Sequence, residues 1–147
     1  MPSKAQNAPA VKNASIKWVE RLKFMGTSYS GHSIVMDAPA NLDGDGSAAT
    51  PSELVLMGLG GCTATDVIRI LKKMRVPLKD LVIDIEALPV ETDPKIYRWI
   101  KIVYHFHGCA DITKARRAVE MSMNKYCSVS AMLAKSADIN YELHFID

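Results

Sequence analysis

The sequence predicts an α+β protein in which antiparallel sheets pack around one long, buried central helix. Segments in both halves of the chain alternate apolar and polar residues with the period of two that is typical of half-buried strands. Between them, residues 51–74 form one uninterrupted helical pattern, and its first half is apolar or small on every side. A helix of that kind must be covered all round.

The N-terminal part predicts a β-hairpin followed by a loop. Residues 15–24 alternate as a strand, 25–27 have the composition of a turn, and 32–36 form the returning strand. Residues 37–49 are rich in Pro, Asn, Asp and Gly, so they predict a loop that borders a pocket.

The central helix has a clear start signal. Thr50 is suited to cap it, Pro51 fits the first helical position, and Glu53 completes a capping box. Such an apolar helix needs more cover than a chain this small provides. Glycines within 58–61 also allow another backbone to approach closely, so we expect an intimate homodimer.

The remaining segments repeat the same two patterns and give an α+β order of elements. They predict strands at 79–90 and 96–107, helices at 111–125 and 128–135, and a last strand at 139–145. Neither an internal repeat nor a linker interrupts this order. We therefore expect a flexible tail at 1–14 and a single domain at 15–147, a normal size for one core.

Composition argues against several classes of protein. The net charge is only +2, and no basic block of the kind that binds nucleic acid is present. The longest uncharged run, 54–65, is shorter than the roughly 20 residues of a membrane span, and the first fifteen residues lack the apolar stretch of a secretory signal. We expect a cytoplasmic protein that binds neither nucleic acid nor membrane.

Three cysteines without a secretory signal predict reduced thiols, and any disulfide between them would be transient. Cys62 lies twelve residues beyond Thr50, roughly 18 Å along the helix, where the helix dipole no longer acts. Asp66 opposes its ionisation, so Cys62 needs a cation from elsewhere, and Arg21 is the candidate. Cys127 precedes the 128–135 helix, whose amides would favour a thiolate directly.

Other interpretations of these residues remain open. Spacing alone favours two inert buried thiols, because Cys62 and Cys127 form no CxxC motif. Cys109 is best interpreted as a bystander thiol. His105 and His107 share a strand face and could bind a metal, but a pair without a third ligand more often lies on an ordinary surface.

Two motifs resemble the OsmC/Ohr family, the osmotically inducible and organic hydroperoxide resistance proteins. Pro51-Ser52-Glu53-Leu54 is followed by Gly58 and by Gly60-Gly61-Cys62, and Tyr126-Cys127-Ser128-Val129 comes later. The similarity extends over nearly the whole chain from Ser15 in the order of elements, and it is closest to a less characterised OsmC-like branch.

The resemblance implies an intertwined homodimer with active sites at the interface between the two chains. It implies a thiol-dependent peroxidase that reduces organic hydroperoxides, in which Cys62 attacks the peroxide and becomes a sulfenic acid. Cys127 then forms a disulfide with Cys62, and an external dithiol reduces it. By the same resemblance Arg21 stabilises the thiolate, and neither a metal nor an organic cofactor is required.

One position departs from the family pattern. In the better studied members an acidic residue, two positions before the one that matches Leu54, pairs with the activating arginine. Ser52 stands there in this chain, and the acid is Glu53, about 100° further round the helix. We take Glu53 as the residue that orients Arg21. The displacement keeps a second hypothesis open, a non-catalytic dimeric protein that binds a small molecule and has structural cysteines.

Overall fold

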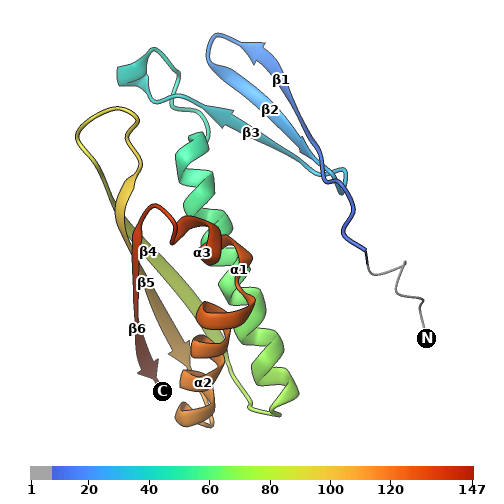
Figure 1. Cartoon of the computed structure of the whole chain (residues 1–147), viewed down its shortest axis with the longest axis vertical. Helices are drawn as coiled ribbons and strands as arrows, with labels where there is room; N and C mark the ends of the chain where they lie inside the picture. Colours follow the sequence, from blue (N-terminus) through green and yellow to red (C-terminus); the bar gives the residue numbers. More distant parts are fainter. Residues whose placement is uncertain (1–7) are drawn as a thin grey trace. The chain divides into compact units, whose positions relative to one another are not determined.

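The computed structural model describes residues 8–147, in two compact units (Figure 1). The first unit ends at Leu54, and the second covers Val55–Asp147. The predicted tail at 1–14 lies partly outside the described residues, and the prediction of a single domain at 15–147 stays a prediction.

The N-terminal unit is an antiparallel sheet in the order β1-β2-β3. Its strands are β1 (Ala14–Glu20), β2 (Lys23–Ser28) and β3 (Ser33–Asp37). The prediction of a single strand at 15–24 was wrong, because the chain reverses direction at Arg21, whose φ is +46°. A register shift between Trp18 and Glu20 leads into this reversal. The alternating pattern continued through the turn and concealed it.

The connection from β3 to the central helix contains a short 3₁₀ helix, η2 (Ala40–Leu42), and is otherwise a loop, as predicted. Asp37 anchors it: its buried Oδ2 accepts hydrogen bonds from the Ser47 amide at 3.0 Å and from the Ser47 hydroxyl at 2.7 Å. The Ser47 hydroxyl is the main reason that the pKa of Asp37 lies below its ordinary value. The carboxylate therefore ties the two ends of the loop together.

The central helix, α1 (Pro51–Lys73), has nearly the predicted bounds. Thr50 caps it, with its Oγ1 accepting from the Glu53 amide at 3.2 Å. One stripe is buried at helical spacing, made of Leu59, Thr63, Val67, Ile70 and Leu71. By length and composition alone α1 could cross a membrane, although the core helix of a soluble protein passes the same test.

The C-terminal unit is built on a sheet in the order β4-β5-β6. The predicted hairpin is confirmed as β4 (Asp80–Pro89) and β5 (Tyr97–His107), which pair antiparallel. The last strand, β6 (Asp138–Ile146), pairs parallel to β5, against our expectation of purely antiparallel sheets. The reason is topological: the helices between β5 and β6 carry the chain back to the end where β5 began.

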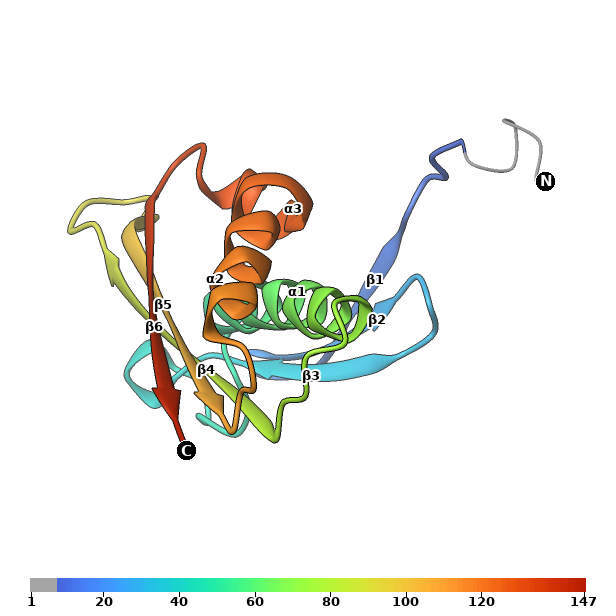
Figure 2. The ribbon, with the colours of Figure 1, turned by 90° about the horizontal axis from the view of Figure 1, so that it is seen from below.

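Three helical segments make that crossover: α2 (Ile112–Met121), the π-helical turn η3 (Ser122–Tyr126) and α3 (Ser128–Leu133). Asp111 caps α2 as predicted, accepting from the Lys114 amide at 3.1 Å. Helices α1 and α2 lie on the same face of the sheet (Figure 2). That face presents every second residue of β5 to the helices, namely the fully buried Ile100, Ile102, Tyr104 and Phe106.

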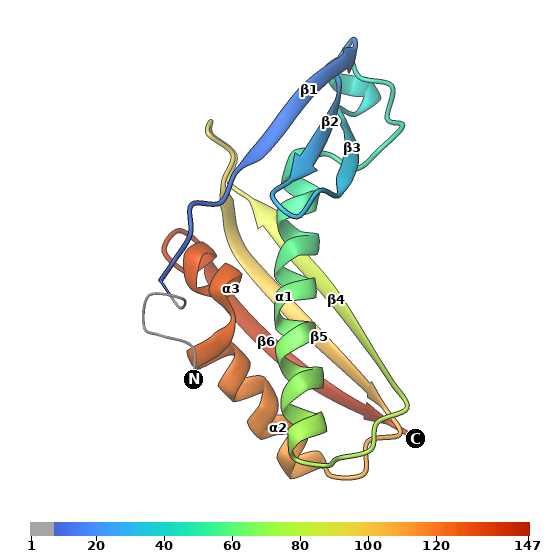
Figure 3. The same ribbon diagram turned by 90° about the vertical axis from the view of Figure 1, so that its right-hand side faces the viewer.

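Among the described residues of the C-terminal unit, nothing covers the opposite side of α1. Val55, Met57 and Ile68 are 41%, 59% and 44% exposed, and α1 crosses the sheet as one long ribbon (Figure 3). The prediction that this helix is buried all round therefore holds for one stripe only. The remaining faces of α1 are exposed in this unit.

Candidate functional site

The structure brings Cys62 and Cys127 together, although 65 positions separate them in the sequence. Helix α1 carries Cys62 in its middle, and Cys127 lies at the junction between η3 and α3. The two Sγ atoms and a carboxylate oxygen of Asp66 all lie within 4.8 Å of one another. Figures 2 and 3 show the cause, since α3 lies next to α1. A disulfide with an S–S length of about 2.05 Å is therefore a short movement away.

The surroundings of Cys62 favour its thiolate. Partial burial raises the pKa of this thiol, but hydrogen bonds from the Val129 and Ser128 amides and from the Cys127 and Ser128 side chains outweigh that effect. The net result is a pKa below the ordinary value. The Ser128 hydroxyl lies 3.9 Å from the Cys62 Sγ. The first turn of α3 thus solvates a negative charge on a cysteine of another helix.

Cys127 is the opposite case. It is the N-cap of α3, as predicted, and its Sγ accepts from the Ser130 amide at 3.4 Å. Burial nevertheless raises the pKa of the Cys127 thiol, and the neighbouring Cys62 raises it further. The expectation that Cys127 is the easier thiolate is therefore corrected. Cys127 is the thiol of the pair with the higher pKa, and its side chain is one of the groups that lower the pKa of Cys62.

A buried chain of hydroxyl groups ends at Asp66. The Thr63 Oγ1 lies 2.7 Å from the Tyr104 hydroxyl and 2.8 Å from the Ser122 Oγ, and Ser122 donates to the Asp66 Oδ2 at 3.0 Å. Each hydroxyl has one proton, so the order of donors runs from Tyr104 through Thr63 and Ser122 to the carboxylate. Burial raises the pKa of Tyr104 to about 12, which keeps it a donor.

A cavity of about 230 Å³ opens beside this cluster. Its wall combines apolar side chains with two cations on successive turns of α1. The lining residues are Asp66, Arg69, Ile70, Lys73, Met74, Met121 and Tyr126. A small organic molecule that carries a negative group would match this lining.

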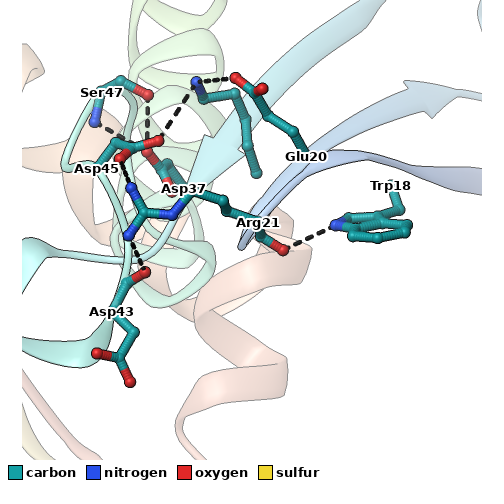
Figure 4. A network of polar contacts seen from close by, with 8 residues as sticks. Trp18, Glu20, Arg21, Asp37, Asp43, Asp45 and Ser47 are labelled. Carbon is teal, nitrogen blue, oxygen red and sulfur yellow. Dashed lines mark hydrogen bonds and ion pairs between the residues drawn. The ribbon is translucent and has the colours of Figure 1, made fainter.

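Arg21 lies in the turn between β1 and β2, within the N-terminal unit (Figure 4). Its guanidinium pairs with the Asp45 carboxylate and donates to the Asp43 carbonyl at 2.9 Å. The Trp18 indole holds the turn by donating to the Arg21 carbonyl at 2.7 Å. Lys23 also lies 3.9 Å from Asp45, so the guanidinium sits in a network of charges from the β3–α1 loop.

Glu53 lies exposed in the first turn of α1, where its amide donates to the cap at Thr50. Its predicted role in orienting Arg21 stays a prediction, as does the role of Arg21 at Cys62. The acid that pairs with Arg21 inside the N-terminal unit is Asp45, from the loop. Sequence reasoning missed this partner, because a loop composition gives no register from which to pair side chains.

The two minor candidates lie apart from the cysteine pair. His105 pairs with Asp84 at 3.0 Å and stacks on His144 with the ring centroids 5.5 Å apart. The Cys109 Sγ donates to the Asp111 carbonyl at 3.5 Å. Among residues 8–147, the group of His, Cys, Asp and Glu side chains that is placed to hold a metal ion is Cys62, Asp66 and Cys127.

Sequence reasoning also missed the hydroxyl chain. Thr63, Ser122 and Tyr104 come from a helix, a π-turn and a strand, and nothing in their local sequence connects them. The π-helical turn η3 is a signal of a functional site, since such turns often occur there. It is visible in the structure and not in the sequence.

Comparison with known proteins now adds to this geometry. The model of the family described as OsmC-like protein matches residues 44–142, which include both cysteines of the pair. Protein YhfA of Escherichia coli (strain K12) is 39% identical over 135 residues, which are 90% of this chain and 97% of the relative.

Solved structures agree in fold. A hypothetical protein from Aquifex aeolicus VF5 is 31% identical with a TM-score of 0.79, covering 95% of this chain and 100% of that one. An organic hydroperoxide resistance protein OsmC from Legionella pneumophila is 18% identical with a TM-score of 0.67, covering 92% and 98%. The second likeness shows the fold alone.

The match over most of the chain turns the resemblance of the two cysteine motifs into membership. The α+β fold with two small sheets and a long central helix is the fold of these relatives. The chain belongs to the OsmC-like protein family, and this membership suggests a redox function related to peroxide or stress.

Proposed function

We propose that this protein is a cysteine-based peroxidase that reduces organic hydroperoxides. The observation that carries the proposal is the opposite shift of two neighbouring thiols, with the pKa of Cys62 lowered and that of Cys127 raised. A peroxidase needs a thiolate for attack and a nearby thiol to resolve the product. One cysteine of the pair suits each task.

The cycle has three balanced steps. The Cys62 thiolate attacks one peroxide oxygen and breaks the O–O bond; the alkoxide takes up a proton and leaves as an alcohol, and Cys62 becomes a sulfenic acid. The Cys127 sulfur attacks that sulfenic sulfur, and water leaves as the disulfide forms. An external dithiol, oxidised to its own disulfide, then restores both thiols.

Two further parts of the proposal concern the surroundings of the pair. Arg21 would stabilise the Cys62 thiolate and the developing alkoxide, with Glu53 orienting it, in a homodimer that supplies the remaining cover of the site. The reaction would take place in the cytoplasm, where thiols are kept reduced. The cavity lined by Arg69 and Met74 offers space for the organic part of the substrate.

Thiol counting tests the mechanism. We expect one equivalent of cumene hydroperoxide to remove two of the three thiols of the reduced protein. Cys127→Ser should lose one thiol and form a sulfenic acid that dimedone traps, whereas Cys62→Ser should lose none. Cys109→Ser is the matched control and should still lose two.

The alternative, a binding protein with structural cysteines, makes the opposite prediction. Under that hypothesis the wild type keeps all three thiols, or Cys62→Ser loses thiols just as the wild type does. The lowered pKa of Cys62 favours the peroxidase, since a passive buried thiol would have its pKa raised by desolvation.

A further inference from the structure

We propose that the reduced site binds one thiophilic divalent cation, with zinc as the best match, through Cys62, Cys127 and Asp66. These side chains offer two sulfurs and one oxygen, all within 4.8 Å of one another. Binding requires only reduced thiols, so it goes beyond the proposed peroxidase and does not depend on it.

The distances fit a tetrahedral ion after a small contraction. Zinc binds cysteine sulfur at about 2.3 Å and carboxylate oxygen at about 2.0–2.2 Å, which places ligand atoms roughly 3.5 to 3.8 Å apart. The distances in the cluster, at most 4.8 Å, therefore have to shorten by about 1.3 Å at most. Rotation of the side chains supplies that much, since Cys62 and Asp66 lie one helical turn apart on α1.

Each of the three ligands is already held by an outer hydrogen bond. Ser122 donates to Asp66 at 3.0 Å, the Ser130 amide donates to the Cys127 Sγ at 3.4 Å, and the amides at the start of α3 donate to Cys62. Such partners orient metal ligands, and they reduce the repulsion between two thiolates and a carboxylate.

The fourth coordination position has a source of water. Asp66 and Tyr126 line the cavity of about 230 Å³, and a water molecule occupies only about 30 Å³. Arg69 lines the same cavity and offsets the single negative charge that remains when one Zn²⁺ meets three anionic ligands.

The donor set also determines the kind of ion. Two sulfurs and one oxygen favour zinc or cadmium, whereas magnesium and calcium require a shell of oxygens. On binding, each cysteine that still carries its proton releases it to the buffer, so proton release should accompany binding of the ion.

The test uses the full chain, fully reduced and freed of metal by a chelator. Titration with CoCl₂ should produce near-ultraviolet bands from sulfur-to-cobalt charge transfer and visible bands of a tetrahedral ion, saturating at one ion per chain. Added ZnCl₂ should remove these bands, whereas MgCl₂ at the same concentration should not.

Variants locate the site. Cys62→Ser and Cys127→Ser should each weaken zinc binding by at least about 100-fold, because losing a ligand costs at least as much as losing a residue that is hydrogen-bonded to a ligand. Asp66→Asn should weaken zinc binding by at least about tenfold. Cys109→Ser is the matched control and should bind as the wild type does. Circular dichroism establishes that each variant is folded, and the oxidised disulfide form should bind no cobalt.

Three results would overturn the proposal. They are reduced protein without a tetrahedral cobalt spectrum, a spectrum that survives in Cys62→Ser and Cys127→Ser, and a spectrum lost in Cys109→Ser. A protein that binds zinc but keeps its thiols under peroxide would contradict only the peroxidase. If the protein both binds zinc and reacts with peroxide, zinc should slow the oxidation of its thiols by peroxide. A chelator should then restore the faster oxidation.

Discussion

At the scale of single residues, the asymmetry of the two thiols decides the chemistry. Cys62 and Cys127 have the same intrinsic acidity, and they differ because α3 starts beside one and buries the other. Hydrogen bonds to a thiolate lower its pKa, whereas desolvation raises it. Cys62, the half-buried partner, is therefore the easier thiolate, and the buried Cys127 is the harder one to ionise.

Alkylation measures this asymmetry directly. In a Cys109→Ser background, the rate of alkylation of Cys62 by iodoacetamide should rise with pH around a midpoint below 9.0, the ordinary value of the thiol. Cys127→Ala removes a hydrogen-bond donor to the thiolate, so the midpoint should move upward. Peptide mapping identifies the alkylated cysteine.

The control for this experiment is Ser136→Ala. The Ser136 hydroxyl donates to the Leu133 carbonyl at the end of α3, and its loss should leave the midpoint unchanged. A wild-type midpoint at or above 9.0, or an unchanged midpoint in Cys127→Ala, would contradict the assignment of the thiolate to Cys62.

At the scale of elements, the start of α1 shows how local sequence fixes a boundary. Thr50 satisfies the amide of Glu53, one of four amides that a helix leaves without an internal partner. Further along, the Thr65 Oγ1 donates to the Gly61 carbonyl at 2.8 Å. This bond adds little stability, because the Gly61 carbonyl lies inside the helix, where the backbone already supplies a hydrogen bond. The threonine that caps α1 and the threonine inside it thus have different energetic roles.

This difference gives a matched pair of stability measurements. Thr50→Ala should lower the free energy of unfolding by about 1 kcal/mol, since it removes a cap. Thr65→Ala should have no cost or a small gain, because alanine has the higher helix propensity. Urea unfolding followed by circular dichroism measures both. Equal losses in the two variants would mean that Thr50 does not act as a cap.

At the scale of the whole molecule, each of the two units exposes large apolar side chains. In the N-terminal unit Ile16 and Trp18 are 59% and 65% exposed. A groove of about 550 Å³ in this unit is lined mostly by apolar side chains of the three strands and by Pro51. On α1, Gly58 and Gly61 have no atom within 4 Å of the place where a Cβ would lie, whereas Gly60 meets Ile85 at 3.1 Å. Open glycines beside exposed Ile68 suit the close approach of a second chain.

The proposed homodimer can be tested with two isoleucines of similar exposure. Ile68 on α1 is 44% exposed, and Ile96 in the β4–β5 loop is 47% exposed. If α1 lies at the interface, Ile68→Glu should dissociate the dimer because it would bury a charge, whereas Ile96→Glu should leave the mass unchanged. Light scattering after gel filtration gives the mass. A monomeric wild type, or the same mass for both variants, would rule out this interface.

The sequence by itself determined the order of elements from α1 onward, the caps at Thr50 and Asp111, and the two motifs that hold Cys62 and Cys127, because all of these depend on residues close together in the chain. Only the tertiary structure decided the turn at Arg21, the parallel pairing of β6 with β5, and which thiol ionises. These features depend on pairing and on burial between segments far apart in the chain. A local pattern of residues contains no information on either.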